Sequence, residues 1–305
     1  MTTPRFTLAM MLLGLSVPAA ALAQDVAYRE AQDHTAAGDL QRPVAVEIPP
    51  PEATQELRLR DGSCLYGRVT AIETDTITFR TSAGVNVTVP RADITSLAIA
   101  EGRIANGEFL PADPNATRLF FGPTARALPR GQGYLGVYEL LLPTLQVGVT
   151  DRLSIGGGTL LIFGGGGGRP VWITPKVQLY SGGRTAVAAG VIHFFVPGGD
   201  PDVGVAYGNA TFGHRDSALT AGVGYAYAAG HGGSGTAVVM IGGEQRASRR
   251  VKLITENYLW RDGGLVSGGV RFLGDRLSAD LGLVAPLHTE TAFAFPFVSF
   301  VWMFR

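Results

Sequence analysis

Residues 276–287 read RLSADLGLVAPL, and larger apolar residues alternate with small or polar ones along the stretch. One face of the alternation holds Leu277, Ala279, Leu281 and Leu283, and the other holds Ser278, Asp280 and Gly282. A period of two predicts a β-strand. The pattern returns in GLVSGGVRFLG (264–274) and VWITPKVQLY (171–180). A soluble sandwich would carry dense charge on its polar face. Here that face is sparse, small and rich in glycine, which favours strands between lipid and a crowded interior.

Similar segments follow one another from residue 117 to residue 304, with no helical periodicity among them. We predict twelve: 117–127, 133–149, 152–163, 170–181, 184–196, 202–213, 217–228, 235–245, 249–260, 264–273, 276–287 and 292–304. The connections alternate between shorter and longer, and aromatic residues gather near segment ends, as in barrels that cross an outer membrane. The predicted fold is all-β, with a transmembrane antiparallel β-barrel of about twelve strands and a small N-terminal β-barrel domain.

Composition agrees with a membrane class. Charged residues make up 16% of the 305 residues, against roughly 25% in ordinary soluble domains. The formal net charge is zero, which gives no electrostatic reason to expect nucleic acid as a partner. Cys64 is the single cysteine, so an internal disulfide framework and a cysteine-built zinc site are excluded. A lone cysteine is most often a small buried hydrophobe, and we expect Cys64 to be one.

The chain before the barrel divides into four intervals. Residues 1–23 hold a cationic start and an apolar stretch that ends in Ala-Leu-Ala, which indicates a secretory signal peptide. Residues 24–53, with three prolines at 49–51, indicate a linker, and 101–116 a second one. Between them, residues 54–100 hold five short alternating segments separated by turn residues. The barrel then takes residues 117–305.

The order LRDGSCLYGRVTAI, a turn, and TITFRT resembles the Sm-like or SH3-like small barrels, over residues 55–100. Sm-like proteins often bind RNA, but an exported copy would meet none. The resemblance therefore implies a fold for this domain and no function.

Motifs for enzymatic chemistry are weak. GGGTLLIFGGGGG (156–168) lacks the Gly-Lys-Ser/Thr end of a phosphate-binding loop, and no helix pattern follows it. His214, Asp216 and Ser217 are residue types of a hydrolase triad, but all three fall in a predicted turn. His193 is expected to face inward and to fill the lumen. We therefore expect no enzymatic activity, no catalytic residue, no metal site and no cofactor.

Charged residues within the predicted strands are few, and a Lys or Arg facing lipid at mid-depth would cost about 2–4 kcal/mol. We predict lumen-facing positions for Arg118, Arg126, Lys176, Glu244, Lys252, Glu256, Arg271 and Asp280. Two interpretations stay open: a lumen that selects polar or ionic solutes, and a salt-bridged interior that fills a narrow barrel. Their mixed signs favour the filled interior. Glu139 falls on the apolar face of its segment, which indicates a bulge or a different register there.

Two stretches carry a wider resemblance. DPNATRLFFGPTARALPRGQGYLG (113–136) and YGNATFGHRDSALTAGVGYAYA (207–228) resemble a family of uncharacterised bacterial outer-membrane β-barrel proteins, over residues 115–304. The end FPFVSFVWMFR (295–305) is similar to the closing strand of such barrels, except that Arg305 follows the last aromatic residue. The resemblance implies contact with outer-membrane lipid and with the barrel assembly machinery through the C-terminal strand. It also implies a periplasmic 54–100 domain of unknown partner, and it supplies no substrate.

On this basis we expect a narrow passive pore or a structural component of the bacterial outer membrane. Two alternatives stay open: a soluble exported β protein that binds a partner through residues 55–100, and a barrel enzyme that acts on lipid. The outer connections are short, so extracellular ligand capture and a plug formed by an outer loop are not expected.

Overall fold

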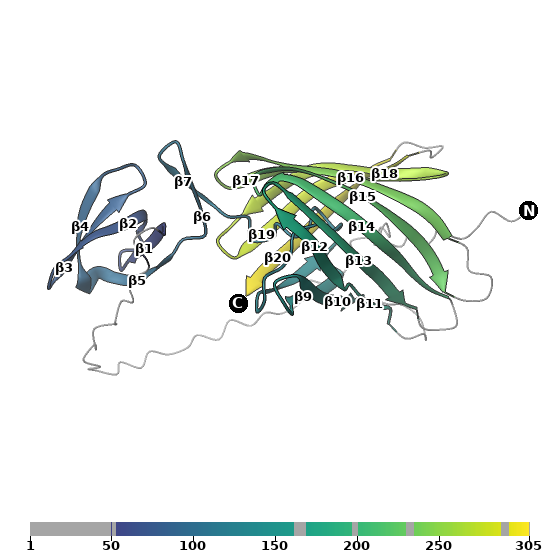
Figure 1. Cartoon of the computed structure of the whole chain (residues 1–305), viewed down its shortest axis with the longest axis horizontal. Helices are drawn as coiled ribbons and strands as arrows, with labels where there is room; N and C mark the ends of the chain where they lie inside the picture. The colour runs from purple at the N-terminus through teal and green to yellow at the C-terminus, as the bar shows by residue number, and fades with distance from the viewer. Residues whose placement is uncertain are drawn as a thin grey trace, which may run out of the picture. The chain divides into compact units, whose positions relative to one another are not determined.

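The structure is a computed structural model that describes residues 50, 53–161, 169–196, 201–229, 235–287 and 293–304 (Figure 1). The predicted signal peptide, most of the first linker and Arg305 lie outside these residues. Apart from one short 3-10 turn, η1 (Arg91–Asp93), every described element is a strand. Within the described residues, no helix is long and apolar enough to cross a membrane.

A five-stranded antiparallel sheet forms the first part of the described chain, in the order β4-β3-β2-β1-β5. Its strands are β1 (Gln55–Leu59), β2 (Cys64–Ile72), β3 (Thr76–Thr81), β4 (Asn86–Pro90) and β5 (Ile94–Ile99). Leu57, Ile77, Phe79 and Val89 are buried in it, one or two from each of three strands. Cys64 is exposed at the start of β2, so the expectation of a buried cysteine is wrong. The residue directly follows the exposed turn at 61–63.

The interval 101–116 contains a hairpin of β6 (Gly102–Ala105) and β7 (Glu108–Pro111). Asn106 and Gly107 both have positive φ, at 53° and 77°. Asn-Gly with two positive φ angles is the sequence that two-residue hairpin turns prefer. The local turn chemistry therefore accounts for this hairpin.

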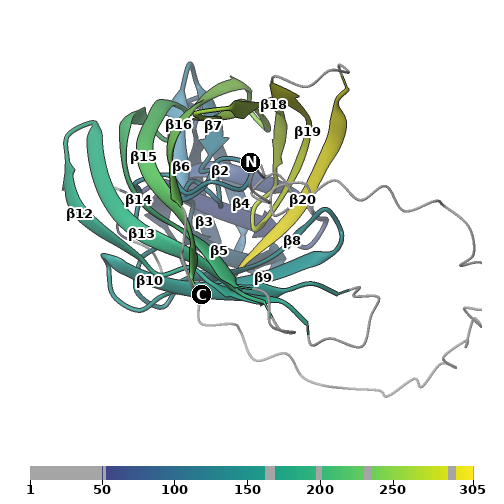
Figure 2. The same ribbon diagram turned by 90° about the vertical axis from the view of Figure 1, so that its right-hand side faces the viewer.

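The rest of the described chain forms a closed antiparallel barrel, which confirms the predicted fold class (Figure 2). Its strands are β8 (Gly133–Tyr138), β9 (Leu142–Gly148), β10 (Leu153–Thr159), β11 (Val171–Ile173), β12 (Lys176–Gly182), β13 (Thr185–Phe195), β14 (Asp202–His214), β15 (Ser217–Ala229), β16 (Gly235–Ser248), β17 (Val251–Trp260), β18 (Gly263–Leu273), β19 (Leu277–Leu287) and β20 (Phe295–Phe304). β11 and β12 both lie between β10 and β13 and act as one interrupted strand, which gives twelve. β20 pairs with β8 from Ser299↔Tyr138 to Phe304↔Gly133 and closes the ring.

Two of the predicted segments differ from the structure. One forms no strand and the other forms two, so the number of strands is still twelve. Residues 117–127 form no strand and contain only the isolated bridge Arg118↔Pro123. Pro123 cannot donate to a ladder, and the backbone around it bonds instead to side chains of the wall. Residues 133–149 form two strands, because Glu139 and Leu140 have positive φ, at 50° and 58°, and turn the chain. Glu139 therefore lies in a turn, which explains its apparent place on the apolar face.

The predicted alternation is present in the wall. In β19, Leu281 and Leu283 are exposed on the outer face, whereas Ser278 and Asp280 are buried on the inner face. His193 has the same parity as exposed Phe195 in β13, so its predicted inward position is wrong. The parity of β13 is set by buried Ala186 and Ala188, which face inward.

The connections differ between the two ends of the barrel. At one end, called here the short-turn end, strands join through residues 149–152, 183–184, 215–216, 249–250 and 274–276. The opposite end, called the long-loop end, has connections at 139–141, 160–170, 196–201, 230–234, 261–262 and 288–294. β8 begins and β20 ends at the short-turn end. An even strand count produces this arrangement.

Candidate functional site

The residues that lead into β8 lie inside the barrel. This stretch, residues 112–128, is called the internal segment. Leu119 is 0% exposed and Phe120 is almost fully buried, and the two form one hydrophobic cluster with Tyr138, Ile254 and Phe297. Those three partners come from β8, β17 and β20. A segment that contacts strands around the ring lies in the lumen.

Glycine on the inner face of the wall makes room for the internal segment. A Cβ placed on Gly242 in β16 would lie 2.2 Å from Leu119 Cδ1. A Cβ placed on Gly282 in β19 would lie 3.0 Å from the ring of Phe120. Both distances are shorter than a carbon–carbon contact allows. The small inner face of the strands is therefore shaped to the segment that it holds.

A buried guanidinium on the wall joins two strands and the internal segment. Arg271 in β18 is 0% exposed. Its Nε lies 2.6 Å from Asp280 Oδ1 and its Nη2 lies 3.0 Å from Asp280 Oδ2, a bidentate ion pair with β19. Arg271 also donates to the carbonyls of Asn115, at 2.9 Å, and Leu119. From inside the segment, Arg118 Nη1 reaches Asp280 Oδ2 at 3.0 Å.

Asp113 extends the charge network to the next strands. Its Oδ2 lies 2.8 Å from Lys252 Nζ in β17 and 3.3 Å from Arg271 Nη1. Lys252 also pairs with Glu244 of β16, which in turn pairs with Arg126 of the internal segment. Opposite charges therefore alternate through the interior, as burial of several ionised groups requires.

The irregular backbone of the internal segment finds its hydrogen bonds on the wall. Lys176 Nζ donates to the carbonyl oxygens of Thr117, Thr124 and Arg126 at 3.2, 3.1 and 2.8 Å. The Glu256 carboxylate accepts from the backbone N–H groups of Phe121 and Gly122 at 3.0 Å. Further bonds join Asn209 to Pro123, Gln178 to Ala125, and Ala125 to Thr211. Buried backbone groups without strand partners need such acceptors and donors.

The structure places all eight residues predicted to face the lumen around this one segment. Those from wall strands are Lys176, Glu244, Lys252, Glu256, Arg271 and Asp280, and all six are buried. Arg118 and Arg126 belong to the internal segment itself, because 117–127 is not a strand. Asp113 was missed, since it falls in the interval expected to be a linker. Its signal is an acidic residue in Asp-Pro-Asn directly before a run that carries two arginines.

Between the internal segment and the long-loop end, the inner face changes character. Val205, Val238 and Trp260 share the inward parity of Asn209, Glu244 and Glu256 and are half-buried. The described strand positions with this parity carry no charge in that part of the barrel. The charged side chains of the inner face therefore lie beside the segment.

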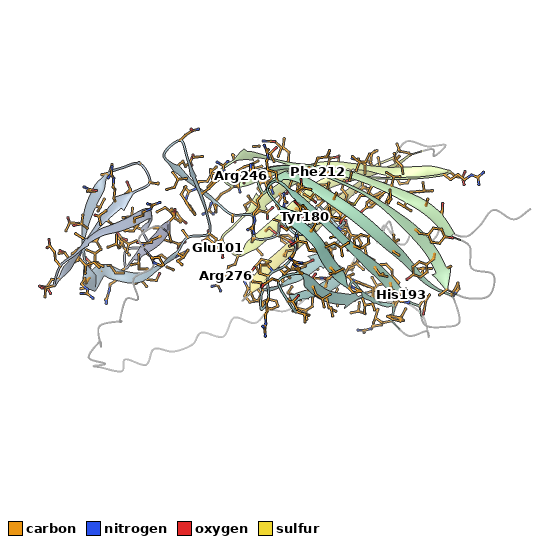
Figure 3. All side chains as sticks on the ribbon, viewed as in Figure 1. Glu101, Tyr180, His193, Phe212, Arg246 and Arg276 are labelled. Carbon is orange, nitrogen blue, oxygen red and sulfur yellow. The ribbon has the colours of Figure 1, made fainter. Side chains whose placement is uncertain are left out.

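Residues considered for chemistry do not assemble into a catalytic site. Asp216 pairs with the Arg246 guanidinium, and no hydrogen bond links it to His214 or Ser217 among the described residues. His193 Nδ1 lies 2.9 Å from Tyr227 Oη on the outer face, toward the long-loop end (Figure 3). Within the described ranges, no group of three or more His, Cys, Asp or Glu side chains is arranged to hold a metal ion.

No protein-family model matches the chain, and no curated protein matches it. Solved structures that are similar to the chain include the following three, all at low identity. The NanC porin in a rhombohedral crystal form has a TM-score of 0.41 and 9% identity, over 57% of this chain and 99% of NanC. OmpT, an outer membrane protein of Vibrio cholerae, has a TM-score of 0.34 and 11% identity, over 82% of this chain and 94% of OmpT. A variant of OmpT that lacks loop L8 has a TM-score of 0.36 and 12% identity, over 82% of this chain and 96% of the variant. Because these TM-scores are below 0.5, the evidence for the closed barrel is the strand pairing within this chain.

Loss of the Arg271 charge is expected to destabilise the barrel strongly. In Arg271→Met, Asp280 keeps Arg118 and Asp113 keeps Lys252, but both carboxylates lose a buried partner. We expect a loss of about 3–5 kcal/mol in the free energy of unfolding, measured by urea denaturation of the detergent-folded protein. Arg152→Met, in an exposed turn, is the control and should change it by less than about 0.5 kcal/mol. Equal stability of the two variants would show that the buried network contributes little.

Gly242→Val should push the internal segment out of place, because the added carbons overlap Leu119. We expect a loss of about 1–3 kcal/mol and increased cleavage of the chain by trypsin after Arg118 or Arg126. Gly268→Val is the matched control, since its Cβ would find no neighbour closer than 4.0 Å. If both variants resist trypsin as the unmodified protein does, the segment does not pack on Gly242.

Proposed function

We propose that this chain is a bacterial outer-membrane β-barrel protein whose lumen the internal segment closes to free diffusion. Its role would be that of a structural membrane component rather than an open passive pore. The observation that carries the proposal is the buried network, in which wall charges bind the segment rather than line an aqueous path. The inner face toward the long-loop end supports the same conclusion, because its described strand positions carry no charge that would attract ions.

The outer face supports the membrane location. Leu179, Val223 and Leu283 are 58%, 66% and 59% exposed, and similar residues occur on most wall strands. A soluble monomer rarely exposes an apolar surface that continues around the molecule. Exposed Tyr180, Tyr225 and Trp302 lie toward strand ends, where aromatic side chains meet a membrane interface. This surface argues against the alternative of a soluble exported protein.

The same proposal covers the lipid contacts, the assembly, the orientation and the export of the chain. Outer-membrane lipid would contact the apolar face, and the barrel assembly machinery would bind β20, which closes the ring. The short-turn end would face the periplasm, together with the 54–100 domain. A signal peptide at 1–23 would direct export. The alternative of a lipid-cleaving barrel finds no assembled nucleophile and base among the described residues.

Planar bilayer recordings test the closed lumen. The purified protein should give no conductance steps, because the segment and the wall charges bind each other inside the barrel. Lys176→Met removes the donor to three segment carbonyls and should give brief openings, whereas Arg152→Met should not. Regular steps from the unmodified protein would contradict closure and restore the narrow passive pore.

The single native cysteine tests the orientation. A membrane-impermeant maleimide should label Cys64 only after the outer membrane is permeabilised. Partial burial raises the pKa of the Cys64 thiol, so labelling is run to completion at about pH 8. Asp262→Cys in a Cys64→Ser background lies at the long-loop end and should be labelled in intact cells. Labelling of Cys64 in intact cells would contradict a periplasmic domain.

A further inference from the structure

A groove lies on the outer wall of the barrel, at the short-turn end. It has a volume of about 780 Å³ and crosses β14, β15, β16 and β17, in the range of pockets that hold small ligands. Phe212, Leu219 and Leu253 line it with apolar side chains, each about half exposed. Figure 3 marks Phe212 near the turn that joins β14 to β15.

The floor of the groove is a glycine that packing does not require. Gly243 in β16 lies between Leu219 and Thr255 in register. A Cβ on Gly243 would meet its nearest atoms, Ala218 O and Thr255 Cγ2, at 3.6 Å, which is ordinary contact. Other wall glycines, such as Gly242, leave no room for a side chain. The absence of a side chain at Gly243 therefore opens the groove rather than relieving a clash.

The end of the groove nearest the turns is polar and cationic. Arg184, Thr185, Ser217 and Gln245 line it, together with Glu244, whose carboxylate is buried and pairs with Arg126 and Lys252 inside the barrel. Arg184 is exposed in the β12–β13 turn and forms no salt bridge with the described carboxylates. A guanidinium flanked by hydroxyl and amide groups is suited to a phosphate diester. The apolar part then continues from this end along the wall.

We propose that this groove binds one glycerophospholipid of the periplasmic leaflet, with an acyl chain over Gly243 and its phosphate at Arg184. The inference rests on the membrane location and orientation proposed above. Charge complementarity selects the occupant, because an apolar trough that ends in a cation at the interface matches a phospholipid. The lipid would lie across β14, β15, β16 and β17, on the outer side of Glu244, which belongs to the buried network.

Native mass spectrometry of the detergent-purified full chain tests this site. The probe is palmitoyl-oleoyl phosphatidylglycerol, and diacylglycerol with the same chains is the comparison without phosphate. One phosphatidylglycerol should bind per barrel. Arg184→Gln should weaken it about tenfold, the effect of losing one charge-assisted hydrogen bond, with little change for diacylglycerol. Gly243→Leu should abolish binding of both lipids. The control is Gly268→Leu, at an outer-face position of another strand where a side chain has space, and it should bind lipid as the unmodified protein does.

Equal lipid binding by Gly243→Leu and Gly268→Leu would overturn the proposed site, and so would an Arg184→Gln variant with unchanged phosphatidylglycerol affinity. Arg184 lies in an exposed turn, so its substitution keeps the test valid if Gly243→Leu folds poorly. Gel mobility with and without boiling separates the two proposals. A heat-modifiable membrane protein without a preferred lipid would remove only the lipid site, whereas a soluble protein would remove both.

Discussion

A guanidinium that solvent cannot reach needs negative charge and carbonyl oxygens on several sides, because removing it from water costs several kcal/mol. Arg271 is in this position, and neither the wall nor the internal segment satisfies it alone. Asp280 supplies a bidentate pair from the wall, while Asp113 and three carbonyls come from the segment. The wall therefore depends on the segment for charge balance, and the segment depends on the wall for its backbone hydrogen bonds. The two behave as one electrostatic unit.

This dependence explains features that would otherwise look unrelated. Glycine at 242 and 282 is needed because Leu119 and Phe120 lie against those positions. Lys176 and Glu256 bind backbone groups rather than side chains of opposite charge, because the segment has neither helix nor strand partners. The charged residues of the inner face lie where they can bind the segment or each other. A barrel organised in this way is filled by its own chain, which is the basis of the closed lumen.

Much of the wall could be predicted because a period of two is a local signal: RLSADLGLVAPL and GLVSGGVRFLG have the faces that were expected. The turn at Glu139 and Leu140 could not, since residues of these types rarely adopt positive φ. The position of 117–127 in the lumen depends on contacts with β8, β17 and β20, which no local pattern contains. The cost of placing charge in lipid predicts an inward position for the eight charged residues, but it does not predict that all of them meet at the internal segment. Asp113 was missed because it falls in the interval expected to be a linker. His193 was misplaced because the parity of β13 is set by two alanines.

Residues 112–128 lie inside the barrel, and a designed disulfide tests this position most directly. Ala125 of the segment packs on Ala186 and Ala188 of β13. In a Cys64→Ser background, Ala125→Cys with Ala188→Cys should form a disulfide in the folded protein, detected as a linked peptide by mass spectrometry. Ala125→Cys with Ala189→Cys, one residue along on the outer face, should not. Two free, readily alkylated thiols in the first pair would contradict the account, because the segment would then lie outside the lumen.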